Sequence, residues 1–324
     1  MSRHSQAIRS IFYTCPLDHR GKSVFLKGKV VDGSEYPPVI LIHDLGESSD
    51  MLEQAAIYFA FLGYSTYYYD LRGHQASHKK VGSIANFGQL ASDLLQVASW
   101  VRHKHSGRPP VLVGQGVGAL IILRVALRYP EVSEKICLMT PVFKLVQPLR
   151  SYQRLILRTA ADLLPHVFLH QNLTPVFRPK SWLSKAQKKH RIRLNAVLAS
   201  ELIIMAEKSV SIVHKIKLPT FICADEANPS FKLSDVRRAS LLRKHARRVK
   251  IVAAPPRIHC PLSCEQGVLE EVIQGLHQWI TGQTEDEIAG SNLLSLNSQQ
   301  SGENEGKSKM IPQALHAQGD EALP

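Results

Sequence analysis

The fold is decided by the stretch VLVGQGVGAL at residues 111–120. Its first three residues are apolar and predict a buried strand, and the apolar run that follows Gly118 predicts a helix. Between them, glycines at alternate positions mark a sharp turn. The stretch therefore predicts a strand, a tight turn centred on Gly116 and a helix, which together form a typical unit of a parallel sheet.

Strand and helix signals alternate on both sides of this unit. The expected strands are Ser23–Val31, Pro38–Ile42, Tyr64–Asp70, Pro110–Gly114, Glu134–Met139, Pro219–Ala224 and Val249–Ala253, and the expected helices between them are Glu53–Leu62, Phe87–His103, Val117–Arg128 and Val268–Ile280. The weak alternation of Ser23–Val31 favours an edge strand. The order of the signals predicts an α/β fold, with a mostly parallel twisted sheet flanked by helices on both faces.

The alternation stops near residue 143, which divides the chain into four parts. Residues 1–142 form the first part of the core, and 143–217 are an expected helical cap insertion that is basic and poor in strand signals. Two amphipathic helices are expected there, Tyr152–Leu164 and Leu194–Lys208. Residues 218–281 complete the core. Residues 282–324 are rich in Gln, Ser, Asn, Glu and Gly, and this composition favours a disordered tail.

The net charge of +13 rises to +18 when the acidic tail, residues 282–324, is left out. Such a charge favours anionic partners, and an anionic membrane surface beside the basic cap is one candidate; a merely solvated basic surface is the alternative. No nucleic acid is expected, because no binding fold for it is recognisable. The chain starts with polar residues and contains five cysteines without a CxxC pair, which predicts a cytoplasmic protein with free thiols. If the cap binds a membrane, the protein would be peripheral to that membrane.

Four short motifs follow one another along the chain. They are LIHDLGESS at residues 41–49, YDLRGHQAS at 69–77 with Gly63-Tyr64 before it, GQGVG at 114–118, and Ile258-His259 ahead of the last helix. Together they resemble the α/β-hydrolase fold, and in particular the serine aminopeptidase S33 and monoacylglycerol lipase (lysophospholipase-like) group, whose members carry HGxGE-S, D-x-RGHG-x-S, GHSMG and a late histidine. The resemblance covers about residues 10–281 and implies an α/β-hydrolase core with a helical cap.

The resemblance also implies a role for each position of the site. The nucleophile position falls on Gly116, the general base on His259, the acid on Asp225 or alternatively Asn228, and the two oxyanion-hole N–H groups on Leu45 and Val117. Two departures accompany Gly116. Asp44 replaces the usual glycine, which either alters the loop or places an acid beside the oxyanion hole, and Gln115 replaces the usual histidine before the nucleophile.

Gly116 decides between the functional hypotheses. Glycine has no side chain that could attack an acyl carbon, and no serine occurs between Ser106 and Ser133. We therefore expect a hydrolase-like protein that is inactive or weakly active and binds an acyl or other apolar ligand, or a protein partner. Three alternatives stay open: an acyl-ester hydrolase that uses His259-activated water or a non-standard nucleophile, an engineered Ser→Gly form of an ordinary lipase-like enzyme, and a membrane-surface adaptor acting through the basic cap. No cofactor or metal is expected, and the oligomeric state stays unknown.

Overall fold

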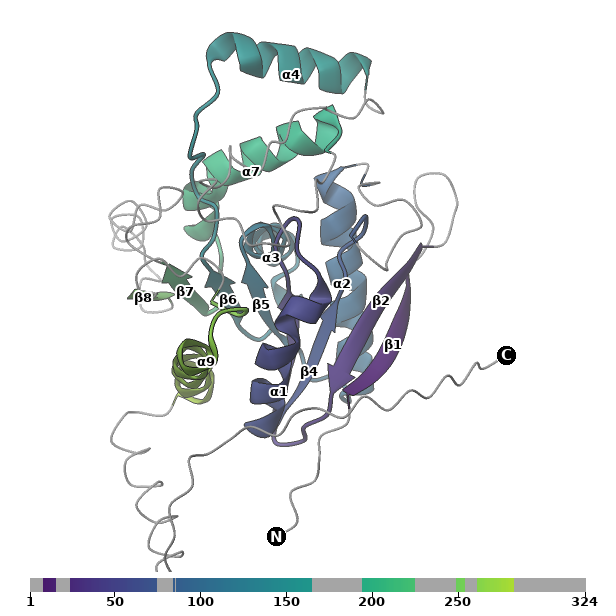
Figure 1. Cartoon of the computed structure of the whole chain (residues 1–324), viewed down its shortest axis with the longest axis vertical. Coiled ribbons are helices and arrows are strands. Elements are labelled where there is room, and N and C mark those ends of the chain that lie inside the picture. Colours follow the sequence, from purple (N-terminus) through teal and green to yellow (C-terminus); the bar gives the residue numbers. More distant parts are fainter. Residues whose placement is uncertain are drawn as a thin grey trace, which may run out of the picture.

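The computed structural model describes residues 8–15, 24–74, 84, 86–164, 194–224, 249–253 and 261–282. Their centre is an eight-stranded sheet with the strand order β1-β2-β4-β3-β5-β6-β7-β8 (Figure 1). The strands are β1 (Ile8–Cys15), β2 (Val24–Val31), β3 (Tyr36–Ile42), β4 (Tyr64–Tyr69), β5 (Val111–Gln115), β6 (Ile136–Met139), β7 (Thr220–Ala224) and β8 (Val249–Ala253). From β4 to β8 all neighbours pair in parallel, whereas β1–β2 and β2–β4 are antiparallel. The predicted α/β fold is confirmed.

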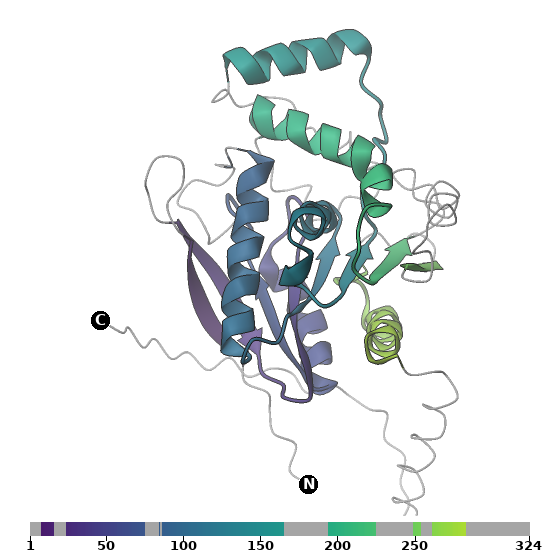
Figure 2. The ribbon, with the colours of Figure 1, turned by 180° about the vertical axis from the view of Figure 1, so that it is seen from behind.

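Helices cover both faces of the sheet, as the alternating pattern predicts (Figures 1 and 2). Helices α2 (Phe87–Lys104) and α3 (Val117–Arg128) belong to the larger apolar core on one face, and α1 (Glu53–Phe61) and α9 (Gln266–Thr281) belong to the core on the other. Short 3₁₀ turns occupy Ser49–Leu52 and Pro130–Val132. Every residue of β4, β5 and β6 is buried, which is typical of strands covered on both faces.

One prediction about the sheet was wrong. The segment 23–31 was expected to lie at the edge, but β2 is an inner strand, because β1 pairs along its whole length from Ile8 opposite Val31 to Cys15 opposite Val24. No strand was expected at Ile8–Cys15, where the structure has β1. Polar residues interrupt its apolar pattern, so the segment gives a weak signal, and only the antiparallel pairing with β2 makes it a strand.

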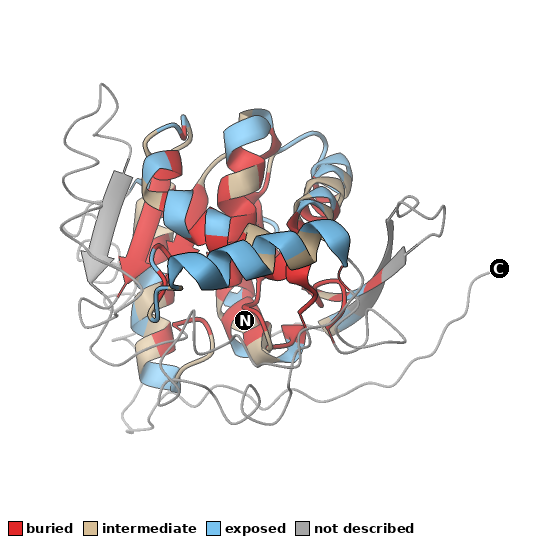
Figure 3. Ribbon diagram, turned by 90° about the horizontal axis from the view of Figure 1, so that it is seen from above, coloured by how far each residue is buried: buried red, intermediate tan, exposed pale blue. Residues whose placement is uncertain are grey.

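Two cap helices lie beyond the carboxyl ends of the parallel strands (Figure 1). Helix α7 (Ala196–Val213) packs on the core through an apolar face that includes Leu198 and Leu202. Helix α4 (Ser151–Leu163) lies over α7, and each of its residues is exposed or half-buried (Figure 3). Arg154 on α4 pairs with Glu207 on α7 through two short contacts of 2.6 and 2.7 Å. Among the described residues no helix is long and apolar enough to cross a membrane.

Candidate active site

The turn between β5 and α3 has the geometry that its glycines predict. Gly116 lies at the tip with φ 57° and ψ −115°, and the first turn of α3 begins at the next residue. Its N–H donates a hydrogen bond to the carbonyl oxygen of Met139, at a distance of 3.0 Å. Glycine adopts this backbone conformation freely, whereas a residue with a side chain would be strained by about 1–3 kcal/mol. The turn thus holds its tip at the carboxyl end of β5, where ligands of open α/β sheets bind.

The two outer glycines of the turn allow elements to approach one another. A Cβ atom on Gly118 would lie 2.6 Å from the carbonyl oxygen of Ile42 and 2.8 Å from that of His43. One on Gly114 would lie 2.6 Å from a side-chain carbon of Ile122. Only glycine fits at such distances. The first turn of α3 therefore lies directly against the end of β3 and brings the loop that follows β3 beside Gly116.

Asp44 lies in this loop, and its side chain contacts the turn. Its Oδ1 accepts a hydrogen bond from the N–H of Val117 at 2.6 Å, and the residue is only 2% exposed. Val117 is the first residue of α3, and the N-terminus of a helix favours an anionic acceptor. The carboxylate of Asp44 therefore accepts the N–H of Val117, one of the two N–H groups that were expected to form the oxyanion hole.

A buried polar network connects the loop, the turn and the segment before α9. The carboxylate of Glu47 accepts hydrogen bonds from the backbone N–H of Asp44 at 3.1 Å and from Nε2 of Gln115 at 2.8 Å. The Oε1 of Gln115 accepts the N–H of Leu262 at 3.1 Å, and its Nε2 also lies 3.4 Å from the hydroxyl of Ser263. Gln115 thus connects the turn to the chain that follows the expected general base, and a glutamine supplies the donor and the acceptor that this requires.

Two buried histidines hold the same loop through hydrogen bonds to backbone groups. His43 donates from Nδ1 to the carbonyl of Asp44 at 2.7 Å and accepts the N–H of Leu71 at Nε2, at 3.0 Å. His74 donates from Nδ1 to the carbonyl of Arg72 at 3.2 Å and accepts the N–H of Gly46 at 3.1 Å. Because both ring nitrogens of each histidine are occupied by backbone groups, neither ring is available as a general base. Their role is to hold the loop in place.

Burial lowers the pKa of both histidines from 6.5 to about 3, and for His74 the nearby His43 contributes to this decrease. Their folded-state pKa lies below the unfolded one, so the unfolded chain binds more protons between pH 6.5 and 3. The free energy of unfolding should therefore fall as the pH drops through 6.5, by up to about 1.4 kcal/mol per pH unit for each histidine. Urea unfolding between about pH 6.5 and 5 measures this slope.

A matched pair of variants identifies the source of this slope. His74→Gln should reduce it by the contribution of one proton, whereas His103→Gln, at an exposed position on α2, should leave it unchanged. A free energy of unfolding that stays constant over this pH range in the unmodified chain would contradict the assignment of two neutral buried histidines.

The remaining expected site residues divide into two groups. Leu45 and Val117 are both buried, and Gly116 directly precedes Val117 at the turn. His259, Asp225 and Asn228 lie outside the described residues, so the expected base and both candidate acids have no described position. Asp44 was recognised in the sequence as an unusual acid but without a partner, and no role was predicted for Glu47. Nothing in the local pattern shows that these acids contact residues about 70 positions away.

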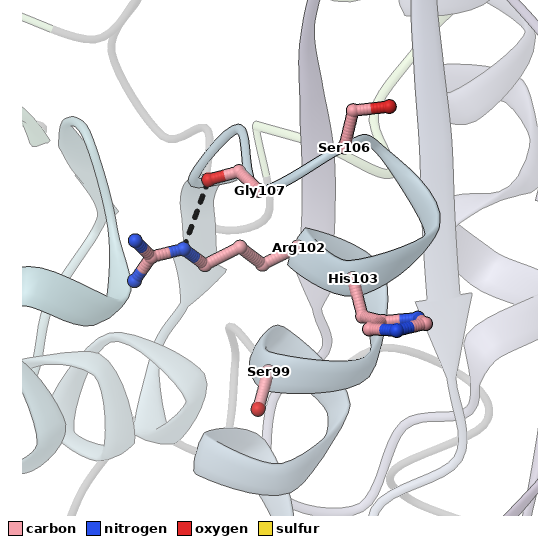
Figure 4. A pocket seen from close by; sticks show the side chains of 5 residues that line it. All are labelled: Ser99, Arg102, His103, Ser106 and Gly107. Atoms are coloured by element: carbon pink, nitrogen blue, oxygen red, sulfur yellow. Dashed lines mark hydrogen bonds between the residues drawn. The ribbon is translucent and has the colours of Figure 1, made fainter.

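A surface hollow of about 500 Å³ lies away from this site (Figure 4). It is lined by Ser99, Arg102, His103, Ser106 and Gly107, at the end of α2 and in the turn that leads into the start of β5. The turn at Gly116 is at the opposite, carboxyl end of β5. In the hollow, Arg102 donates from Nε to the carbonyl of Gly107 at 2.9 Å. This contact holds the turn after α2 and has no connection to the candidate active site.

Comparisons with known proteins agree with the fold and the motifs. The model of the Hydrolase_4 family, described as serine aminopeptidase S33, matches residues 36–250. A monoglyceride lipase homologue of monkeypox virus is 26% identical over 221 residues, which cover 66% of this chain and 78% of the relative.

Two solved structures share the fold at low sequence identity. A monoacylglycerol lipase from Paleococcus ferrophilus has a TM-score of 0.66 at 19% identity and covers 80% of this chain and 99% of its own. A thermostable carboxyl esterase from Bacillus coagulans, in complex with glycerol, has a TM-score of 0.68 at 16% identity and covers 85% of this chain and 98% of its own. With the family model matching well over half of its length, the chain belongs to the serine aminopeptidase S33 family of α/β hydrolases.

Proposed function

We propose that this chain is a non-catalytic or weakly active member of its family that binds an acyl or other apolar ligand, or a protein partner, at the former active site. The observation that carries the proposal is Gly116 at the tip of the turn before α3. A serine hydrolase places its attacking hydroxyl at this tip. Losing the nucleophile of such a site costs about 10⁶-fold in rate, because the remaining groups supply only binding and charge stabilisation.

The sequence around the tip supports this proposal. No serine or cysteine lies between Ser106 and Ser133, so a shift of register by a few residues does not supply a nucleophile. Glycine also fits the positive φ of the tip without strain, so the replacement preserves the turn while it removes the chemistry. A monoglyceride lipase homologue among the relatives makes an acyl chain the first candidate ligand.

The alternative is a hydrolase in which His259 activates water directly and the N–H groups of Leu45 and Val117 stabilise the oxyanion. The hydrogen bond from Val117 to Asp44 counts against it, because an N–H that already donates to a carboxylate is not available to a developing oxyanion. The binding proposal is therefore favoured over water activation.

Hydrolysis and binding can be measured side by side with monolauroylglycerol and its non-hydrolysable ether analogue. We expect the unmodified chain to bind the ether analogue in calorimetry, and to release lauric acid from the ester no faster than the His259→Ala variant. Release of lauric acid that His259→Ala abolishes would overturn the proposal in favour of water activation. Absence of binding together with absence of hydrolysis would refute the acyl ligand and leave a protein partner as the occupant.

A second candidate function, membrane-surface binding, is favoured by the outer face of α4. Tyr152, Leu155, Ile156 and Leu163 are between 55% and 72% exposed, and their spacing places them on one side of the helix. Exposed Arg158 lies on the same helix, and the whole chain has a net charge of +13. An apolar stripe beside cationic side chains fits the interface of an anionic bilayer.

Sedimentation with lipid vesicles tests this second candidate. The chain should sediment with vesicles that contain phosphatidylserine and less with pure phosphatidylcholine, and Leu155→Glu/Ile156→Glu should abolish the binding. A control variant, Phe61→Glu, changes an apolar residue that is 81% exposed at the end of α1 and should leave sedimentation unchanged. Binding that is indifferent to the α4 variant would exclude this surface.

A further inference from the structure

The carboxylate of Asp44 accepts the first N–H of α3, that of Val117. In the family motif the position of Asp44 is glycine, and the N–H of the residue after the nucleophile is left to the substrate oxyanion. Here the Oδ1 of Asp44 lies 2.6 Å from the nitrogen of Val117, which is a short, charge-assisted geometry. The carboxylate takes the place that the oxygen of a reacting acyl group would take in an active relative.

The structure holds this carboxylate firmly. The backbone N–H of Asp44 donates to Glu47, and its carbonyl oxygen accepts from both the Nδ1 of His43, at 2.7 Å, and the N–H of Glu47, at 3.1 Å. His43 is fully buried and Asp44 is 2% exposed, so water does not compete freely for these groups. With the main chain fixed on both sides, the side chain stays at the N-terminus of α3.

Asp44 and Glu47 both have hydrogen-bond donors at this end of the sheet. The positive end of the α3 dipole faces the carboxylate, and Val117 donates directly to it. The other buried acid nearby, Glu47, accepts donors of its own from Gln115 and from the Asp44 backbone. The donors at this end of the sheet are thus shared between the two acids.

We propose that Asp44 is an internal occupant of the former oxyanion hole and determines which ligands the site accepts. It keeps the N–H of Val117 from any ligand oxygen and places negative charge where relatives stabilise it. Acyl ligands with a neutral end group, such as glycerol esters or ethers, are therefore accepted, whereas the carboxylates of free fatty acids are excluded. This inference rests on the proposed function, because it concerns a ligand of the same site.

The amide signal of Val117 reports directly on this occupancy. Labelling glycine at the carbonyl carbon and valine at the nitrogen selects Gly-Val pairs, and the sequence contains only two, Gly116–Val117 and Gly267–Val268. Val268, on α9, serves as an internal reference. In the unmodified chain we expect a downfield Val117 amide proton, typical of a short hydrogen bond, that does not move when sodium laurate is added.

Two variants at position 44 separate occupancy from charge. Asp44→Gly removes the acceptor, so the Val117 signal should move upfield and then shift on titration with laurate, with an affinity for laurate about tenfold or more above that of the unmodified chain. Asp44→Asn keeps an oxygen acceptor without the charge, so Val117 should remain unresponsive. If Asp44→Gly does not fold, Asp44→Ala, which also lacks an acceptor, replaces it.

Three results would overturn the inference: a Val117 signal that responds to laurate in the unmodified chain, one that fails to respond in a folded variant without an acceptor, or equal responses in Asp44→Asn and Asp44→Gly. None of these results depends on turnover. Release of lauric acid by the unmodified chain would instead refute the proposed function while leaving the Val117 readout intact, so the two failures can be told apart.

Discussion

Replacing Asp93 by alanine is expected to lower the free energy of unfolding by about 3–5 kcal/mol. The carboxylate of Asp93 on α2 makes two contacts with Arg72, at 2.9 Å to Nε and 2.6 Å to Nη2. The two side chains are only 1% and 6% exposed. Removing the acid would leave a guanidinium charge buried without this partner, and the cost of that desolvated charge exceeds the value of the ion pair itself. Measured urea unfolding curves test this expectation.

An exposed ion pair on the cap provides the control. Arg154 and Glu207 make contacts of similar length, but their side chains are 43% and 34% exposed, so solvent screens them. Glu207→Ala should therefore cost no more than about 1 kcal/mol. Equal losses for Asp93→Ala and Glu207→Ala would show that burial does not determine the cost of removing the acid from these ion pairs.

Replacing Gly118 by alanine is expected to cost about 3 kcal/mol, at the upper end for the insertion of a single methyl group. The added Cβ would lie 2.6 and 2.8 Å from two carbonyl oxygens at the end of β3, and such backbone atoms cannot rotate away as the end of a side chain can. Helix α3 would have to move away from β3, and the loop that carries Asp44 would move with it. The Val117 amide signal should therefore change as well.

A glycine in α9 gives the opposite expectation. A Cβ atom on Gly275 would meet nothing within 4 Å, and the position lies inside a helix. Gly275→Ala should therefore raise the free energy of unfolding by about 0.5–1 kcal/mol, through helix propensity alone. A Gly118→Ala variant that is as stable as the unmodified chain, or more stable, would mean that the contact between α3 and β3 is looser than the structure describes.

Local sequence patterns were sufficient for most of the fold. The helix Val117–Arg128 was predicted with the observed bounds, because the glycine turn fixes its start and its apolar residues are continuous. Helix α7 was expected to end at Lys208 but continues to Val213. Its last turns contain serine and β-branched residues, which are poor helix formers, and the burial of Ile212 and Val213 outweighs that propensity.

The chemistry of the site was less accessible from the sequence. Gly116 could be recognised because the turn motif is contiguous. The contact between Asp44 and Val117 joins residues 73 positions apart and depends on the close approach that Gly118 permits. Such a contact has no local signature, so the sequence could indicate an unusual acid near the expected oxyanion hole but could not show that this acid accepts the N–H of Val117.

Labelling with a fluorophosphonate probe tests whether the turn tip carries a nucleophile. The probe forms a covalent bond with an activated serine, and mass spectrometry of the intact chain and its peptides locates the adduct. We predict that the unmodified chain acquires no adduct, because Gly116 offers no hydroxyl group and no serine lies between Ser106 and Ser133. A stoichiometric adduct on one serine, together with loss of ester hydrolysis when that serine is replaced by alanine, would contradict this prediction.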